Sequence, residues 1–313
     1  MLRATFLGTS SSRPTVRRNV ASLAVQREGD SFLFDCGEGT QRQMMRFGVG
    51  FSVRDIFITH LHADHYLGLP GLLRTLSLQG REEELVVWGP EGSETILRAT
   101  IELGGDRLQF PVPVRELPAG EAVRYEGFSI RTFPVEHTST SVGLALVEDT
   151  RLGRFDAATA IRLGVPEGRA FGRLHRGEDV RLDDGELVRA ADVVGPERPG
   201  RTLVYSGDTR PCDSTVQAAT GADLLIHEAT FSEEEERRAQ DTRHSTAREA
   251  ATVAARAGVR KLVLTHFSAR FSEQALRLVR EAESVFAAVA AEDGMVIEIL
   301  FPNQEAETGD HRA

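Results

Sequence analysis

Thr59-His60-Leu61-His62-Ala63-Asp64-His65 places three imidazoles and one carboxylate within six residues, at the end of a predicted apolar strand over Arg54–Thr59. In extended backbone, His60, His62 and Asp64 would lie on one side. His65 breaks this alternation and would face a second, adjacent ion. Neutral imidazoles and carboxylates suit zinc, and manganese or iron accept the same ligand types. The segment therefore predicts a metal site at a strand end.

Three further candidate ligands follow predicted strands elsewhere in the chain, and they are needed because four ligands leave two ions under-coordinated. With Asp208 as a bridging carboxylate, seven side chains suffice for two ions: His60, His62, Asp64, His65, His137, Asp208 and His266. The alternative is a set of separate, hydrogen-bonded histidines. Packing alone gives no reason to crowd three imidazoles and a carboxylate together, so the sequence favours two bound metal ions.

Short strand-like runs alternate with helical stretches along most of the chain. Strands are predicted over Arg3–Leu7, Ser22–Gln26, Ser31–Phe34, Arg54–Thr59, Leu85–Trp88, Phe128–Val135, Val142–Val147, Thr202–Tyr205, Asp223–Ile226, Lys261–Leu264 and Met295–Phe301. Helices are predicted over Tyr66–Leu78, Ser93–Leu103 with Gly104 as its C-cap, Thr246–Ala257 and Glu273–Ala291. We expect one catalytic domain over residues 1–303 and a polar C-terminal tail over 304–313.

The segment from Arg151 to Pro199 does not continue this alternation of strands and helices, because it is rich in glycine, proline and charged residues and its hydrophobic periodicity is weak. Between Arg151 and Arg181 it carries seven arginines against four acidic residues. A segment of this length is either a functional arm or a poorly packed surface insertion, and its composition leaves both readings open.

Composition limits the possible classes of protein. Of 313 residues, 41% are hydrophobic and 27% are charged, which is typical of a globular domain. No apolar run approaches the roughly 20 residues of a membrane span, and the start of the chain does not resemble a signal peptide. Two cysteines, Cys36 and Cys212, make no disulfide framework. We therefore expect a cytoplasmic protein with no membrane partner.

The net charge of −10 argues against a nucleic-acid partner, because phosphate neutralisation drives such binding. A whole-chain average can nevertheless hide a local basic face, and a carboxylate-rich metal site adds negative charge that cations cancel. Lys261 is the only lysine, so nearly all basic charge is arginine, which suits bidentate phosphate contacts.

The metal motif, with the later His137, Asp208 and His266, resembles that of the metallo-β-lactamase superfamily. This resemblance implies an α/β fold, a four-layer αββα sandwich with the metals at one edge of its two sheets. Five other segments resemble ribonuclease Z, the tRNA 3′-processing endonuclease family: Phe6–Ser11, Asp35–Gln41, Gly68–Leu72, Leu225–Thr230 with its HEAT motif, and His244-Ser245-Thr246. The likeness runs from about Leu2 to Pro302.

Resemblance to ribonuclease Z implies a zinc-dependent phosphodiesterase that removes the 3′ trailer from precursor tRNA, leaving a tRNA 3′-hydroxyl and a 5′-phosphorylated trailer. It also implies a homodimer, two Zn²⁺ per subunit with Mn²⁺ possible, and a protruding arm at about residues 151–199 that grips tRNA. Two departures concern tRNA binding. Val16 stands where the family's basic loop has lysine, and the arm's Gly-Pro element is degraded to Pro166–Arg169.

Three side chains are predicted to act in catalysis. Asp64 would bind one ion and accept the proton of the attacking water. His244, oriented by Glu228, would stabilise the phosphate or protonate the leaving oxygen. His244 precedes a segment with capping-box spacing, so the positive end of a helix is expected beside it. The alternative makes Glu228 and His244 a purely structural pair.

Arg17 and Arg18 are the predicted phosphate-positioning residues, against the alternative of ordinary surface charge. Two rival functions share the metal ligands. One is a two-metal hydrolase of small esters, such as an arylsulfatase or a lactonase. The other is a tRNA-binding protein with a structural zinc, although structural zinc sites are usually four-coordinate and rich in thiolates.

Overall fold

The computed structural model describes residues 1–103 and 107–301, which form two compact units. Unit 1 comprises Met1–Val147 and the chain from Thr202 onward, and unit 2 is the inserted segment Glu148–Arg201. The predicted tail over 304–313 and the predicted C-cap Gly104 lie outside the described residues.

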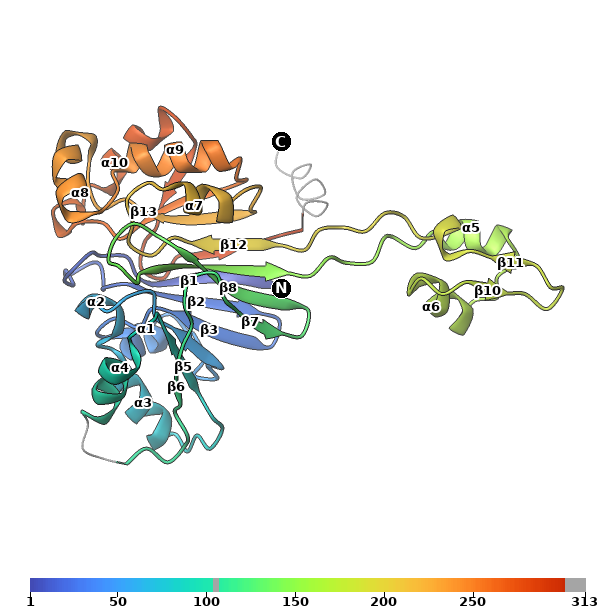
Figure 1. The fold of residues 1–313 in the computed structure, drawn as a ribbon, viewed down its shortest axis with the longest axis horizontal. Helices are drawn as coiled ribbons and strands as arrows, with labels where there is room; N and C mark the ends of the chain where they lie inside the picture. Colours follow the sequence, from blue (N-terminus) through green and yellow to red (C-terminus); the bar gives the residue numbers. More distant parts are fainter. Residues whose placement is uncertain (104–106, 302–313) are drawn as a thin grey trace. The chain divides into compact units, whose positions relative to one another are not determined.

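Unit 1 contains two seven-stranded mixed sheets (Figure 1). The first has the order β16 (Val296–Glu298), β1 (Leu2–Gly8), β2 (Ser22–Arg27), β3 (Asp30–Phe34), β4 (Asp55–Phe57), β5 (Val86–Gly89) and β6 (Val114–Glu116). The second has the order β15 (Ala288–Ala290), β14 (Leu262–Thr265), β13 (Leu224–Glu228), β12 (Thr202–Tyr205), β9 (Val142–Glu148), β8 (Phe128–Pro134) and β7 (Ala122–Tyr125).

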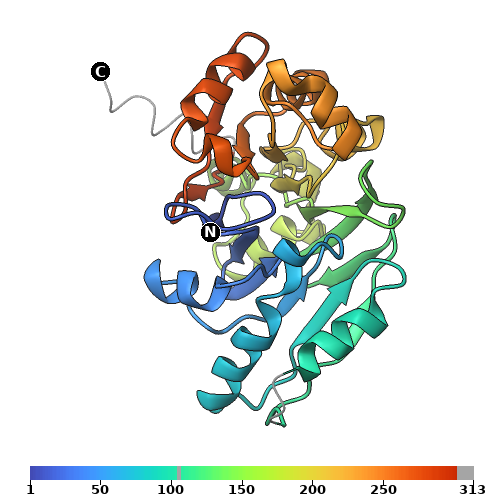
Figure 2. The ribbon, with the colours of Figure 1, turned by 90° about the vertical axis from the view of Figure 1, so that its left-hand side faces the viewer.

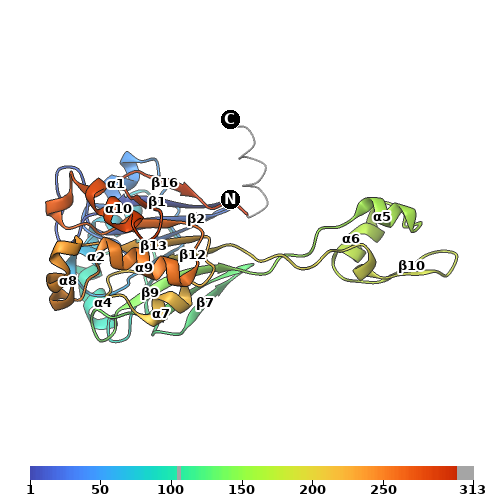
Figure 3. The same cartoon turned by 90° about the horizontal axis from the view of Figure 1, so that it is seen from above.

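The two sheets bury aromatic and aliphatic side chains of both between them, including Phe32, Phe57, Phe128 and Leu203. Helices cover the outer faces, as Figures 1 and 3 show. On the first sheet lie α1 (Thr40–Arg46), α2 (Ala63–Tyr66), α3 (Leu69–Leu78) and α4 (Glu94–Glu102). On the second lie α7 (Asp213–Ala218), α8 (Glu236–Thr242), α9 (Ala247–Ala257) and α10 (Ala275–Glu283). This confirms the predicted four-layer αββα sandwich.

Sheet topology determines where the functional side chains lie. Strands β12, β13, β14 and β15 run parallel, and so do β3, β4, β5 and β6. The carboxyl ends of parallel strands meet at one edge of a sheet, so the segments that follow them come together. A backbone hydrogen bond of 3.0 Å from Val142 N to Thr59 O joins the two sheets beside the metal motif.

Unit 2 has its own small hydrophobic core, formed by residues such as Ala160, Leu174 and Val188. Around it lie α5 (Ala157–Arg162), α6 (Arg169–His175) and the hairpin β10 (Val180–Arg181) and β11 (Leu187–Val188). The insertion is therefore a folded unit, which the weak periodicity of its sequence did not indicate.

The predicted helix over Glu273–Ala291 is wrong in its second half. Helix α10 ends at Glu283, and residues Ala288–Ala290 form β15, which pairs in parallel with β14. Pairing with an open sheet edge overrides the helix preference of alanine there. The predicted helix over Tyr66–Leu78 is interrupted at Gly68, where an added Cβ would lie 2.0 Å from the Gly37 carbonyl oxygen. The predicted helix over Thr246–Ala257 is confirmed as α9, with Thr246 as its N-cap.

Candidate metal centre

The seven predicted ligands gather at the end of unit 1 that carries α2 and α8, which Figure 2 views face on. In one group, His60, His62, His137 and Asp208, the potential ligand atoms all lie within 4.8 Å of one another. A second group with the same spacing is Asp64, His65 and His266. Asp208 adjoins both groups, because its Oδ2 is 3.5 Å from His60 Nε2 and its Oδ1 is 3.3 Å from His266 Nε2.

This donor set fits a metal ion. Three buried atoms, His60 Nε2, His65 Nε2 and Asp208 Oδ1, have no hydrogen-bond partner among the described residues. An unpartnered buried polar group costs roughly 1–3 kcal/mol, so a bound cation would satisfy atoms that the chain leaves unsatisfied. Burial, with the neighbouring His65, lowers the pKa of His60 well below its usual range. The neutral imidazole is the form that binds metals.

The expected alternation within the metal motif is corrected by the structure. Asp64 groups with His65 and His266, not with His60 and His62. The physical reason is that extended backbone ends at His62, where the helical turn α2 begins. In a helical turn, Asp64 and His65 are no longer on opposite sides of the backbone, as they would be in a strand, and Asp64 Oδ2 lies 3.6 Å from His65 Nε2.

Glu228 and His244 form a hydrogen-bonded pair beside Asp208. The Glu228 carboxylate is fully buried and lies 2.8 Å from His244 Nδ1. It also accepts hydrogen bonds from Thr209 N at 2.8 Å, Thr230 Oγ1 at 2.6 Å and Ser245 N at 3.1 Å. With Thr230 N at 3.3 Å, five donors around one carboxylate hold it in a single orientation.

Electrostatics make His244 a proton donor. Burial by itself would lower its pKa, but the charge and hydrogen bond of Glu228, together with Asp208, raise the pKa of His244 to about 9. The Glu228 carboxylate therefore favours the protonated form of the imidazole. With Nδ1 donating to Glu228, Nε2 is left free to donate elsewhere.

Sequence reasoning missed Asp35, whose carboxylate contacts His65 and the backbone of Thr59. Its buried carboxylate accepts hydrogen bonds from Thr59 N at 2.8 Å and Tyr205 Oη at 3.0 Å, and it lies 2.8 Å from His65 Nδ1. Metal-binding histidines usually donate their second ring N–H to such a carboxylate, which fixes the tautomer. In the sequence, the segment Asp35–Gln41 indicated only a resemblance to the family. The expectation that a metal-binding histidine needs a carboxylate partner could have assigned this role to Asp35.

Backbone strain is concentrated around the cluster. Among the described non-glycine residues, five have positive φ: Ser12, Glu28, Asp35, Arg243 and His266. All but Glu28 bear on the site. Ser12 N donates to Asp64 Oδ2 at 2.7 Å, and the Arg243 carbonyl lies 2.9 Å from His137 Nδ1. Strained residues persist where surrounding contacts hold them, and they are typical of functional sites.

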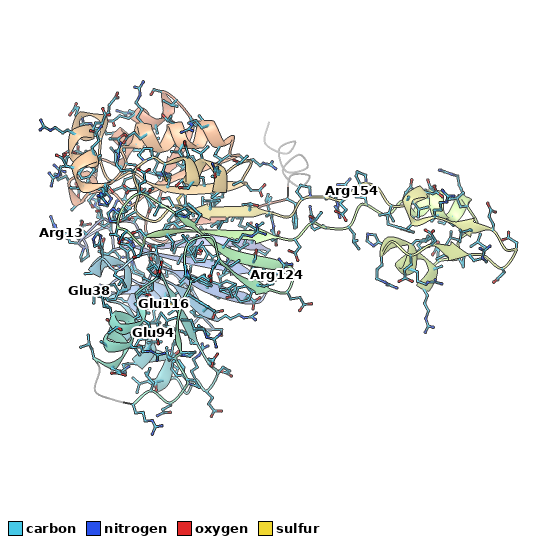
Figure 4. The ribbon with its side chains drawn as sticks, in the orientation of Figure 1. Arg13, Glu38, Glu94, Glu116, Arg124 and Arg154 are labelled. Atoms are coloured by element: carbon cyan, nitrogen blue, oxygen red, sulfur yellow. The ribbon has the colours of Figure 1, made fainter. Side chains whose placement is uncertain are left out.

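The two arginines predicted to contact phosphate occupy different environments. Arg17 is 69% exposed and lies 3.2 Å from Glu273. Arg18 is only 6% exposed, and its Nη1 donates to Thr9 Oγ1 at 2.7 Å and to the Ala291 carbonyl at 2.6 Å. The structure therefore gives Arg18 an internal role. Figure 4 shows a third arginine, Arg13, at the end of unit 1 that carries the metal cluster.

The αββα sandwich, with a histidine and aspartate cluster able to hold metal where its parallel strands end, defines a metallo-β-lactamase-fold protein. Residues 192–267 match the family model described as the Beta-lactamase superfamily domain, and residues 2–158 match the model described as Anti-Pycsar protein Apyc1. The crystal structure of human tRNase Z, short form (ELAC1), is similar, with a TM-score of 0.68 and 30% identity, and the match covers 96% of this chain and 100% of that one.

Relatives of higher sequence identity define the family more narrowly. A ribonuclease Z of Gemmatimonas aurantiaca is 54% identical over 306 residues, covering 97% of this chain and 98% of the relative. A ribonuclease Z of Haloferax volcanii is 52% identical over 315 residues, covering 99% of each. The chain belongs to the ribonuclease Z family. Among the described residues, no helix is long and apolar enough to cross a membrane.

Proposed function

We propose that this chain is a metal-dependent endoribonuclease that removes the 3′ trailer from precursor tRNA, leaving a tRNA 3′-hydroxyl and a 5′-phosphorylated trailer. The observation that carries the proposal is the convergence of seven metal-ligand side chains with the His244–Glu228 pair, in a chain of the ribonuclease Z family. We also propose a cytoplasmic location, which is usual for a family that processes tRNA.

Two Zn²⁺ per subunit are the proposed cofactors, with Mn²⁺ as the alternative ion. His60, His62 and His137 would hold one ion, and Asp64, His65 and His266 the other. Asp208 would bridge them, since it lies near ligands of both groups: its Oδ2 is 3.5 Å from His60 Nε2 and 3.4 Å from His65 Nε2, and its Oδ1 is 3.3 Å from His266 Nε2. When bound, such a pair of cations acidifies water and neutralises charge on a phosphate.

The chain's own residues then move the protons. Water attacks phosphorus, and the bond between phosphorus and the ribose 3′-oxygen breaks. Asp64, held by Ser12 N, would accept a proton from the attacking water. His244, protonated through its partnership with Glu228, would donate a proton to the departing 3′-oxygen. The N-terminus of α9 follows His244 and adds positive potential for the phosphate.

Substrate binding is assigned to arginines and to unit 2. Arg17 is exposed and remains a candidate for phosphate contact, whereas Arg18 would act by holding the loop that carries Arg17. We propose that unit 2, the predicted arm, binds tRNA, and that the enzyme is a homodimer. Sedimentation of the purified chain tests the dimer.

The decisive experiment incubates the protein with a 3′-extended tRNA precursor, with and without a chelator, and reads the cut position. We expect cleavage at the end of the mature tRNA that the chelator abolishes. A second experiment uses a variant in which a short linker replaces Glu148–Arg201. A ribonuclease should then lose precursor cleavage and keep hydrolysis of a small phosphodiester, whereas a hydrolase of small esters would never have cut the precursor.

A further inference from the structure

Arg210 lies two residues beyond Asp208 and links three segments of the site without being a predicted ligand. Its backbone N–H donates to the carbonyl of Glu136 at 2.9 Å, beside His137. Its side chain turns to the opposite segment, where Nη1 donates to the carbonyl of His244 at 2.8 Å. One residue thus hydrogen-bonds the backbone next to His137 and the backbone of His244 itself.

The Arg210 guanidinium is held in place by Glu249. Nη1 lies 2.9 Å from Glu249 Oε2 and Nη2 lies 2.5 Å from Oε1, so the pair is bidentate. The two side chains are 18% and 21% exposed, so solvent screens their charges less than it screens those of a surface ion pair. Glu249 is also the third helical residue of α9 and accepts from Thr246 N at 2.9 Å in the capping box. Arg210 is therefore fastened to the first turn of α9.

The His244 backbone needs such a contact. The residue before it, Arg243, has φ 57°, a conformation that costs free energy and persists only where neighbouring contacts hold it. His244 N donates to the Ala239 carbonyl at 2.8 Å, and Arg210 takes the His244 carbonyl. The imidazole itself is bound by Glu228. With Arg210 removed, the His244 carbonyl would lose this hydrogen bond, while the contacts with Ala239 and Glu228 would remain.

We infer that Arg210 is a positioning residue for the leaving-group step, holding His244 where it can protonate the departing oxygen. This inference rests on the proposed function. Its specific consequence is selectivity between substrates. A ribose 3′-oxygen is a basic leaving group that needs a proton, whereas p-nitrophenolate leaves without one. Loss of Arg210 should therefore harm RNA cleavage more than hydrolysis of bis(p-nitrophenyl) phosphate.

The test measures kcat and KM of metal-saturated enzyme on both substrates for wild type, Arg210→Gln, Arg210→Lys and His244→Ala. For Arg210→Gln we expect kcat on precursor tRNA to fall by about 10- to 100-fold, since displacing a catalytic group by about 1 Å has effects of that size. The loss on the small diester should be at least about tenfold smaller. His244→Ala should show the same selectivity, and Arg210→Lys, which keeps the charge without the two-pronged contact, should lose less.

A matched control comes from the same helix. Arg256 donates to Asp213 at 2.7 Å, but this pair is exposed and lies at the last turn of α9, whereas His244 precedes the helix. Arg256→Gln should keep wild-type kcat on both substrates. Should Arg210→Gln fail to fold, Glu249→Gln weakens the same contact from the other side and should shift selectivity in the same direction.

Equal losses on the two substrates, or undiminished RNA cleavage by Arg210→Gln, would overturn the inference and leave the proposed function intact. Absence of precursor cleavage by the wild type would overturn both. Metal content measured on each variant separates the outcomes, because a role in metal binding would lower it, whereas a role in positioning His244 would leave it at the wild-type value.

Discussion

At the scale of single residues, Asp35 orients the His65 ring and with it the nitrogen that His65 would offer to a metal ion. The Asp35 carboxylate lies 2.8 Å from His65 Nδ1, so the opposite nitrogen, Nε2, is left for a ligand. Replacing Asp35 with Asn keeps the shape but turns one acceptor oxygen into a donor. We expect Asp35→Asn to weaken metal binding by about 10- to 100-fold, the usual cost of losing such a partner. Competition with a fluorescent chelator measures it.

Tyr205 supplies the matched control, because its hydroxyl donates to the same carboxylate at 3.0 Å without touching His65. Tyr205→Phe should weaken metal binding much less than Asp35→Asn. Equal affinities for wild type and Asp35→Asn would show that His65 needs no carboxylate to orient it.

Arg18 gives the second prediction at this scale. Its guanidinium binds Thr9, Ala291 and, through Nε, the Ser272 carbonyl at 3.1 Å, and it lies 4.9 Å from the centre of the Phe267 ring. Removing it leaves several buried acceptors unsatisfied. We expect Arg18→Gln to lower the free energy of unfolding by about 2–4 kcal/mol, measured by urea denaturation.

Arg17 is the control for Arg18, since its contact with Glu273 is exposed. Arg17→Gln should leave the free energy of unfolding unchanged within error. Should Arg18→Gln instead keep full stability and raise the KM for RNA, Arg18 would be a phosphate contact, as its sequence position predicted.

The residues that sequence could identify are those whose chemistry is local. Crowded imidazoles at a strand end have few explanations other than a metal, so His60, His62 and His65 were recognisable together. The internal role of Arg18 was not, because its partners Thr9, Ser272 and Ala291 lie far apart in sequence. Arg210 was missed for the same reason, since its contacts depend on how three loops meet.

At the scale of secondary structure, α9 tests whether capping stabilises the element beside His244. Thr246 Oγ1 accepts from Glu249 N at 3.2 Å, and the Glu249 side chain accepts from Thr246 N. We expect Thr246→Ala to reduce the free energy of unfolding by about 1 kcal/mol, the typical cost of a lost N-cap. Chemical denaturation measures the change.

Thr252, in the exposed middle of the same helix, is the control, because its hydroxyl bonds only to the Arg248 carbonyl at 2.9 Å. Thr252→Ala should be neutral or slightly stabilising, given the higher helix propensity of alanine. A loss from Thr252→Ala as large as that from Thr246→Ala would mean that the cap contributes nothing specific.

Elements with local signals were predictable, and elements determined by tertiary pairing were not. The capping box and alanine-rich face of α9 lie within one short segment, so its bounds were found nearly to the residue. The strand β15 has the composition of a helix and exists only because β14 offers it an edge. Hydrophobic periodicity cannot distinguish a helix such as α9 from a strand such as β15 here, since it depends on the sequence of the segment and not on the strand beside it.

At the scale of the whole molecule, a negative net charge is compatible with the proposed phosphate substrate, because the carboxylates of the metal cluster are buried. Net charge is −10 over the chain, yet six of the seven predicted ligands are buried, and the carboxylates among them face imidazoles and, when present, cations. The family's implied arm corresponds to unit 2, which has a core of its own. On the proposed function, RNA binding would depend on local arginines such as Arg17, not on the average charge.

Metal stoichiometry tests the arrangement of the entire site. His62 belongs to the group with His60 and His137, whereas Asp64, His65 and His266 form the other. Wild-type protein stripped by a chelator should take up two Zn²⁺ per chain on dialysis, and its melting temperature should rise because a ligand that binds only the folded state stabilises it. His62→Ala should retain about one ion and lose cleavage of precursor tRNA. His175→Ala, whose imidazole contacts the Gly153 carbonyl within unit 2, should still bind two. If His62→Ala bound two ions with wild-type affinity, or if the stripped wild type bound none, the division of ligands between two ions would be wrong, whatever the activity of the enzyme.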